Sequence, residues 1–278
     1  MSVYQQIKDK FIMKNAYKDW AYYRSELTEI ILEMNPESVM IIGAGRCNDI
    51  DLYEISSETE KVICIDVDED SVNDAIEKLP ENLREKIEYK CVSLTGIYED
   101  DMEEFCENLL DFARREGGGI TSENFRTRMI QCIDVLKSKM IRNEEELLKL
   151  IPEASVDVLI CSGVYSQMFS TLLFFIRSLV NSLYGIITNV NDLESEAEKM
   201  ICDMNDRVIP IINSALSRAA RKNVIFGNEY NPESPVEGAV QCISYVREYM
   251  NPFETHLKWY FNRAEGIVYD MLIQVCSK

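Results

Sequence analysis

Two glycines and an acid are spaced as in a nucleotide-binding site. Gly43 and Gly45 follow the apolar run 38–42, and Asp66 ends a second apolar run, 61–66, about twenty residues later. Glycine adopts backbone angles closed to other residues, and because it has no side chain a ligand can lie against its main chain. A carboxylate at the end of the second run can accept hydrogen bonds from both ribose hydroxyls. The pattern therefore predicts a site for a ribose-bearing ligand, without specifying which one.

The motif is compatible with two classes of ribose-bearing ligand. A dinucleotide fingerprint needs a third glycine in G-x-G-x-x-G, but Asn48 stands at that position, and Cys47 replaces the last glycine of a G-x-G-x-G loop. The apolar strand, the G-x-G loop and the acid after the next strand resemble the class I S-adenosylmethionine-dependent methyltransferases. The sequence departs from that family's pattern where Ile41 and Ile42 stand in place of an acid before the first glycine.

The resemblance implies S-adenosylmethionine as the cofactor and a set of residues around it. Gly43 and Gly45 would lie beside its methionine part and Asp66 on its ribose, while Ser93 or Thr95 would have to read the adenine amino group. The cofactor-binding residues that the resemblance implies are Gly43, Ala44, Gly45, Asn48, Asp49, Asp66, Val67, Ser93 and Ser162. The alternative role of Asn48 or Asp49 is to cap the helix that follows.

The side chains that could contact a methyl acceptor come from separate segments. Methyl transfer from a sulfonium is an in-line displacement with a good leaving group, so alignment and the exclusion of water supply most of the acceleration. A general base is needed only where the acceptor starts protonated. The candidates are Tyr98, Tyr165, Gln167 and the single histidine, His256. Each has an alternative role in the core or in a loop, and the sequence assigns no catalytic residue.

Charge narrows the choice of partner. The chain has 29 basic and 48 acidic residues and a net charge of −19, which repels phosphate backbones and anionic lipid. The sequence lacks the N-P-P-Y signature of amine methylation, and it has Asn191-Asp192 after the fifth predicted strand but no acid after the fourth, as metal-dependent O-methyltransferases would need. We therefore expect a small-molecule substrate, with no nucleic acid, membrane or metal as partner.

The cysteines and the start of the chain predict the compartment. Nine cysteines are scattered without a C-x-x-C pair, which is typical of reduced thiols in a cytosolic protein. Met1 is followed by polar and charged residues with no apolar signal core, and no apolar stretch is long enough to span a membrane. The protein is expected to be cytoplasmic.

The order of predicted elements favours an α/β fold with a doubly wound, seven-stranded, mostly parallel sheet and a C-terminal antiparallel hairpin. Helices are expected over 3–34 with a break near Asn15, and a loop-rich segment over 222–235. A long helical region starts at Asp192 and is interrupted at Pro210, and another helix covers 236–250. The predicted strands are 38–42, 61–66, 87–92, 156–161, 185–189, 255–261 and 267–275.

These elements suggest an N-terminal helical cap, 1–36, before a Rossmann-like methyltransferase domain, 37–278, with helical insertions near 101–154 and 192–250. The first insertion would cover a substrate or form a homodimer surface. Three functions follow from the sequence: methyl transfer to a small molecule, a non-catalytic adenosyl-binding or protein-interaction module on the same fold, and an NAD-dependent oxidoreductase. The terminal hairpin favours the first two, because a plain dinucleotide-binding sheet lacks it.

Overall fold

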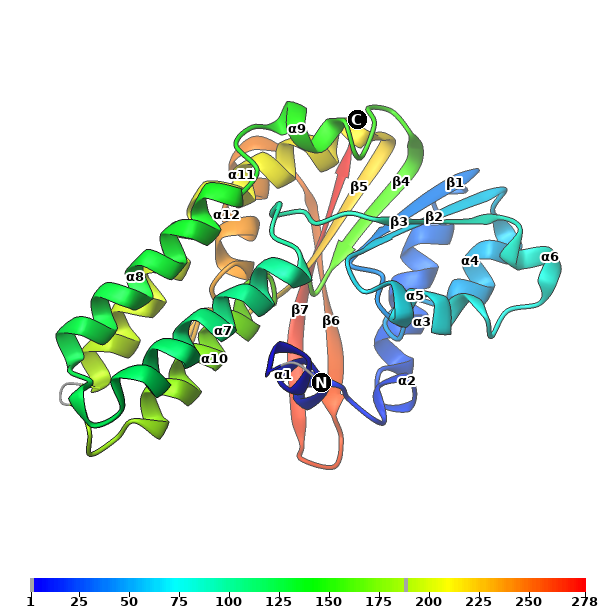
Figure 1. Ribbon diagram of the computed structural model, residues 1–278. Helices are drawn as coiled ribbons and strands as arrows, with labels where there is room; N and C mark the ends of the chain where they lie inside the picture. The colour runs from blue at the N-terminus through cyan, green and yellow to red at the C-terminus, as the bar shows by residue number, and fades with distance from the viewer. Residues whose placement is uncertain (1–2, 188–189) are drawn as a thin grey trace. The chain divides into compact units, whose positions relative to one another are not determined.

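The computed structural model describes residues 3–187 and 190–278, which form two compact units (Figure 1). Unit 1 consists of the described residues up to Ile12 together with 94–141 and 167–208. Unit 2 consists of 13–93, 142–166 and 209–278.

Unit 2 is built around a seven-stranded sheet with the order β3-β2-β1-β4-β5-β7-β6. Neighbouring strands from β3 to β5 are parallel, whereas β7 is antiparallel to both β5 and β6. The carboxyl ends of the five parallel strands therefore meet at one edge of the sheet. The strands are β1 (Ser38–Ile42), β2 (Lys61–Asp66), β3 (Ile87–Cys91), β4 (Val156–Ser162), β5 (Ala220–Glu229), β6 (Phe253–Asn262) and β7 (Ile267–Ser277).

The burial of each strand follows from its place in the sheet. Every residue of β1 and β4 is buried, as expected for central parallel strands covered on both faces, which read as continuous apolar runs. The edge strands β3 and β6 are only partly buried. The helices of unit 2 are α2 (Ala16–Asp19), α3 (Ala21–Leu32), α4 (Leu52–Glu58), α5 (Glu69–Ile76), α6 (Glu81–Arg84), α9 (Glu144–Leu148), α12 (Ala239–Tyr249) and the second part of α11 (Val190–Ala219).

Aromatic rings hold α3 and the segment before it against the β6–β7 hairpin. The Tyr23 ring stacks on Trp259 with 5.1 Å between centroids, and Trp20 packs edge-on against the same indole at 4.7 Å. The Trp20 indole N–H donates to the carbonyl of Phe261 at 2.9 Å. These contacts place Trp20 and α3 against β6, near the end of that strand.

Unit 1 is helical. It contains α1 (Val3–Phe11), α7 (Glu99–Glu116), the short 3₁₀ helix η1 (Gly117–Gly119), α8 (Ser122–Lys139), α10 (Ser170–Ser182) and the first part of α11. Its long helices lie side by side (Figure 1). Ion pairs join them, with Arg126 of α8 on Glu196 of α11 at 2.7 Å and Arg177 of α10 on Glu198 of α11.

Most of the predicted elements are confirmed. The first four strands and the terminal hairpin lie within one or two residues of the predicted bounds, and the helices before Pro36 break around Asn15. The sheet is mostly parallel with a C-terminal antiparallel hairpin, as predicted. Within the described ranges, no helix combines the length and the apolar character needed to cross a membrane.

The fifth strand was predicted at the wrong place. It is Ala220–Glu229, most of which was predicted as loop, and it pairs with both β4 and β7. Of the predicted strand 185–189, residues 188–189 lie outside the described part of the chain, and Ile187 makes only an isolated bridge to Tyr184. The Asn and Gly residues around the apolar core of β5 are typical of turns. Hydrogen bonding of this segment to β4 and β7 outweighs that local preference.

The expected interruption at Pro210 is also absent. Pro210 lies inside α11, which continues to Ala219 as one helix. A proline removes one intrahelical hydrogen bond and crowds the preceding turn, which a helix packed along its length can tolerate. Ile209 and Ile212, on either side of it, are fully buried.

Candidate functional site

The glycine loop after β1 is bonded to the end of β2. The backbone N–H groups of Gly43 and Ala44 donate to the carbonyl of Ile65 at 2.8 and 3.1 Å. Gly43 has φ = 67° and Gly45 has φ = 45°, both in the left-handed region that glycine enters without strain. The turn therefore requires the residue type that the sequence supplies, and it leads the backbone along the carboxyl edge of the sheet.

The Asp66 carboxylate faces this loop. Its Oδ2 accepts the Gly45 N–H at 2.8 Å, and its Oδ1 accepts the Asp68 N–H at 2.8 Å. Burial raises the pKa of Asp66, and backbone hydrogen bonds from Asp68, Gly45 and Val67 oppose that rise. Each carboxylate oxygen has a second lone pair, so two further donors can be accommodated. The structure thus brings Gly45 and Asp66 together, as their spacing predicted.

The two glycines differ in what lies beside them. A Cβ added to Gly43 would come within 2.4 Å of Val164 Cγ2, whereas one added to Gly45 would meet only Asp66 Oδ2, at 4.0 Å. Gly43 therefore admits the close approach of Val164 from the loop after β4. Gly45 is partly buried, with only Asp66 Oδ2 near this position, and Gly43 is exposed apart from its contact with Val164.

The end of β4 is tied to α3 by a buried hydrogen bond. The hydroxyls of Ser162 and Tyr23 lie 2.7 Å apart, and both residues are buried. Gly227 of β5 permits this pair, because a Cβ there would lie 2.8 Å from Ser162 Oγ and 3.0 Å from the Tyr23 hydroxyl. Ser162, which the family resemblance implies for the cofactor, has its hydroxyl engaged by Tyr23.

Glu229, at the carboxyl end of β5, is a candidate that the sequence analysis missed. Ser166 Oγ donates to its Oε1 at 2.8 Å, while its Oε2 is buried and has no hydrogen-bond partner among the described residues. Burial raises the pKa of Glu229, opposed by the hydrogen bonds it accepts. Its charge contributes to the raised pKa of Tyr23 and of Tyr269, both of which are raised mainly by burial.

A signal for Glu229 exists in the sequence. The apolar run Val224–Phe226 leads into Gly227, Asn228 and Glu229, as the run 61–66 leads into Asp66. An apolar run that ends in an acid predicts a carboxylate at the carboxyl edge of a parallel sheet once the run is recognised as a strand.

Asp49 follows the glycine loop and is partly buried. Burial raises the pKa of its carboxyl group to about 6, opposed by a backbone hydrogen bond and by the Arg24 guanidinium. Arg24 also donates to the carbonyl of Asn48 at 2.9 Å. Neither Asn48 nor Asp49 caps the next helix: the N-cap of α4 is Asp51, whose carboxylate accepts the Glu54 N–H at 3.1 Å.

The remaining residues implied for the cofactor lie along the same edge of unit 2. Ala44 and Ser93 are buried, and Val67 is partly buried where β2 ends. The carboxylates of Asp49, Asp66 and Glu229 make this edge acidic. Among the residues that the structure describes, no three His, Cys, Asp or Glu side chains are grouped so that they could hold a metal ion.

The four acceptor candidates have separate surroundings. Tyr165 is 1% exposed in the core of unit 2, and its hydroxyl donates to Asn213. His256 lies on the edge strand β6, two strands and therefore about 10 Å from β5, with Nδ1 3.2 Å from Asp270 Oδ1. Tyr98 precedes α7 and Gln167 precedes α10, both in unit 1. Within unit 2, neither Tyr165 nor His256 lies beside the glycine loop.

The sheet order and the antiparallel β7 identify the fold of the chain. The chain has the fold of the class I S-adenosylmethionine-dependent methyltransferases. The sequence matches no protein-family model, and no curated protein matches it.

Solved methyltransferase structures resemble this chain over most of its length at low sequence identity. The methyltransferase domain of bacterial CtHen1-C is 12% identical, with a TM-score of 0.42 over 93% of this chain and 100% of that one. A SAM-dependent methyltransferase from Aquifex aeolicus is 11% identical, with a TM-score of 0.43 over 98% of each chain. The N-methyltransferase NodS from Bradyrhizobium japonicum WM9 is 9% identical, with a TM-score of 0.43 over 96% of this chain and 99% of that one.

Proposed function

We propose that the chain binds S-adenosylmethionine at the carboxyl edge of β1 and β2 and transfers its methyl group to a small-molecule acceptor. The observation that carries this proposal is the hydrogen bond of 2.8 Å from the Gly45 N–H to the Asp66 carboxylate. It joins the open backbone of the loop to the acid at the point where two adjacent parallel strands end. Ligands of open α/β sheets bind at this edge.

The residues at this edge fit a nucleoside. Asp66 keeps a lone pair on each oxygen after accepting the two backbone hydrogen bonds, so its carboxylate can accept both ribose hydroxyls. Gly45 has no side chain to cover the adjacent backbone, and no atom lies closer than 4.0 Å to the position of a Cβ there. Both features support an adenosyl group held between the loop and the carboxylate.

The cofactor, when bound, supplies a methyl group on a sulfonium, which needs little chemical assistance to leave. The part left to the chain is to orient the acceptor and to exclude water. Glu229 suits this part, because its unpartnered Oε2 can accept a hydrogen bond or a proton from an acceptor that carries one. Its raised pKa strengthens it as a base compared with an exposed glutamate.

The charge of the site supports the choice of acceptor. Asp49, Asp66 and Glu229 bring three carboxylates to one edge of unit 2, and the whole chain carries −19. A phosphate-rich acceptor would be repelled by both. A neutral or cationic small molecule is therefore favoured over a nucleic acid.

A second function is favoured by one observation. Val164 Cγ2 occupies the side of Gly43 where a Cβ would lie, although this glycine is otherwise exposed. The resemblance implies that the methionine part of the cofactor lies beside Gly43 and Gly45. A non-catalytic module that binds an adenosyl group at Asp66 alone is consistent with this packing.

Calorimetry and a turnover assay separate these functions. We expect S-adenosylmethionine and S-adenosylhomocysteine to bind with similar affinity and NAD to bind far more weakly. Production of S-adenosylhomocysteine is then measured with small amines, small phenols and RNA as acceptors. Turnover with a small molecule supports the enzyme, whereas adenosyl binding without turnover on any acceptor supports the binding module. Tighter binding of NAD than of either adenosyl compound would contradict both.

A further inference from the structure

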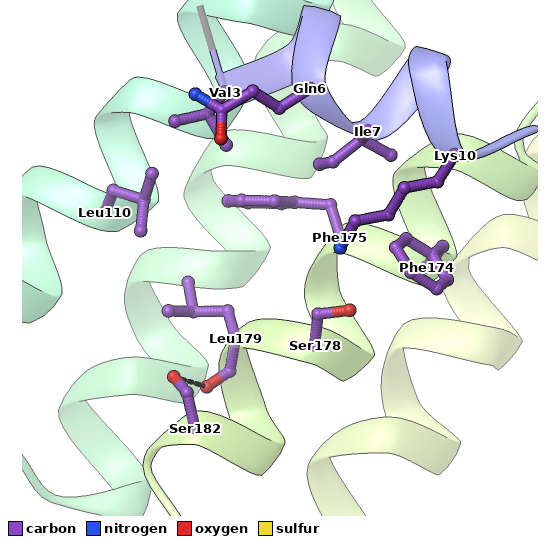
Figure 2. A pocket seen from close by; sticks show the side chains of 10 residues that line it. All are labelled: Val3, Gln6, Ile7, Lys10, Leu110, Phe174, Phe175, Ser178, Leu179 and Ser182. Carbon is purple, nitrogen blue, oxygen red and sulfur yellow. Dashed lines mark hydrogen bonds between the residues drawn. The ribbon is translucent and has the colours of Figure 1, made fainter.

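Unit 1 contains a pocket that the proposed function does not use. It lies between α1, α7 and α10, is open to solvent and has a volume of about 240 Å³ (Figure 2). It is lined by Val3, Gln6, Ile7, Lys10, Leu110, Phe174, Phe175, Ser178, Leu179 and Ser182. All of these residues belong to unit 1, so the pocket is defined within a single compact unit.

The floor of the pocket is apolar and held in place by ring contacts. Ile7, Phe175 and Leu179 are each less than 8% exposed. The Phe175 ring packs edge-on against Phe105 of α7 with 6.1 Å between centroids. Phe174, at one side of the pocket, packs edge-on against Phe11 of α1 at 5.3 Å. The apolar surface is therefore formed before any ligand binds, which lowers the entropic cost of binding one.

One end of the pocket is cationic. Figure 2 shows the Lys10 side chain turned inward, with its ammonium on the side where the Ser178 hydroxyl lies. The ammonium is 5.6 Å from the centroid of the Phe174 ring. Within the described part of the chain, Lys10 has no carboxylate at ion-pair distance, whereas Lys8 on the same helix pairs with Glu99. Lys10 is exposed, so its ammonium is available to an anion that enters the pocket from solvent.

We propose that this pocket binds an alkyl monocarboxylate of about eight carbons, with its carboxylate at Lys10 and Ser178 and its chain over Ile7, Phe175 and Leu179. The positive charge of Lys10 selects an anion, and the hydroxyl of Ser178 adds a donor for a carboxylate oxygen. The volume of 240 Å³ equals about eight water molecules, and a methylene group takes about the space of one. Burial of the alkyl chain supplies the affinity, and the charged end supplies the selectivity.

The test is calorimetric titration of the full chain with octanoate, 1-octanol and octylamine. We expect one octanoate to bind per chain, with the alcohol at least about tenfold weaker and the amine weaker still. The variant Lys10→Met should weaken octanoate by about tenfold, the loss that a charge-assisted hydrogen bond implies, and leave 1-octanol unchanged. The matched control is Lys18→Met on α2, an exposed lysine in unit 2, which should bind octanoate like the parent chain.

A second variant tests the location without disturbing the core. Ser178→Trp places a large ring in the pocket from an exposed helix position, and it should abolish octanoate binding. The control Ser138→Trp puts the same ring on the exposed face of α8 and should not affect binding. Equal affinity for octanoate and octylamine, full affinity in Lys10→Met, or no binding by the parent chain would each overturn the proposal. The adenosyl titration is unaffected by any of these results, so the two proposals fail separately.

Discussion

The change Asp66→Asn tests the proposed cofactor site most directly. The carboxylate accepts backbone N–H groups at both oxygens, and the proposal adds a ribose hydroxyl to each. Asparagine keeps one acceptor oxygen and replaces the other with an NH₂ group, which cannot accept. A hydrogen bond to a charged group contributes about 1.5–3 kcal/mol, so the loss predicts adenosyl binding weaker by about 10- to 100-fold.

The same change should have little effect on stability, which separates binding from folding. Burial raises the pKa of Asp66 in the folded chain above its unfolded value, although its hydrogen bonds to Asp68 and Gly45 oppose the rise. The folded state therefore holds this proton more tightly, and the ionised carboxylate lowers stability as the pH rises between the two pKa values. Asparagine removes that cost at pH 7 but leaves one backbone N–H without its acceptor, so the net change should stay within about 1 kcal/mol.

Two assays decide the outcome. Calorimetry with S-adenosylhomocysteine gives the affinity, and urea unfolding gives the free energy of unfolding. The control is Asp70→Asn, an exposed acid in the first turn of α5, which should change neither. In the parent chain, affinity should also fall as the pH is lowered toward the raised pKa of Asp66. An unchanged affinity in Asp66→Asn, or an equal loss in Asp70→Asn, would refute the placement of the ribose at this carboxylate.

Three further predictions concern the framework of unit 2. Asp49→Asn should raise the free energy of unfolding at pH 8 by about 1–2 kcal/mol, with the gain shrinking toward pH 4: the parent's folded-state pKa is about 6, so its stability falls as the pH rises from the unfolded value of about 3.9. Gly43→Ala should cost about 2–4 kcal/mol in urea unfolding, from its φ of 67° and its clash with Val164, and adding Val164→Ala should recover at least about 1 kcal/mol; strict additivity would contradict this packing. Asp157→Asn should cost about 1–3 kcal/mol at pH 7, a modest value because its partners, Arg221 and Lys222, are about half exposed. Burial alone would raise the pKa of Asp157, but hydrogen bonds including those from Lys222 and Arg221 lower it. This contribution should therefore shrink in pH-dependent unfolding as the pH falls from about 4 through the lowered pKa of the folded chain; a cost of the same size at pH 6 and at pH 2 would contradict it.

Local patterns in the sequence were sufficient for the centre of the sheet. The runs at β1, β2 and β4 are continuous and apolar because these strands are covered on both faces, so they can be recognised without knowledge of their neighbours. The spacing of Gly45 and Asp66 predicted their meeting, since adjacent parallel strands bring their carboxyl ends to one edge. Both the apolar runs and this spacing are properties of short, continuous segments, so they can be read from the sequence.

Only the tertiary structure identified β5 and, with it, Glu229. Asn223, Gly227 and Asn228 favour turns locally, and pairing with β4 and β7 overrides that preference. The Ser162–Tyr23 hydrogen bond joins residues 139 positions apart, and the approach of Val164 to Gly43 also crosses strands. The sequence by itself determined β1 to β4, the terminal hairpin, the glycine turn and the acid opposite it, because each follows from a short-range pattern. The structure decided which carboxylates are buried and which hydroxyls are engaged, because burial and partners depend on segments that meet only when the chain folds.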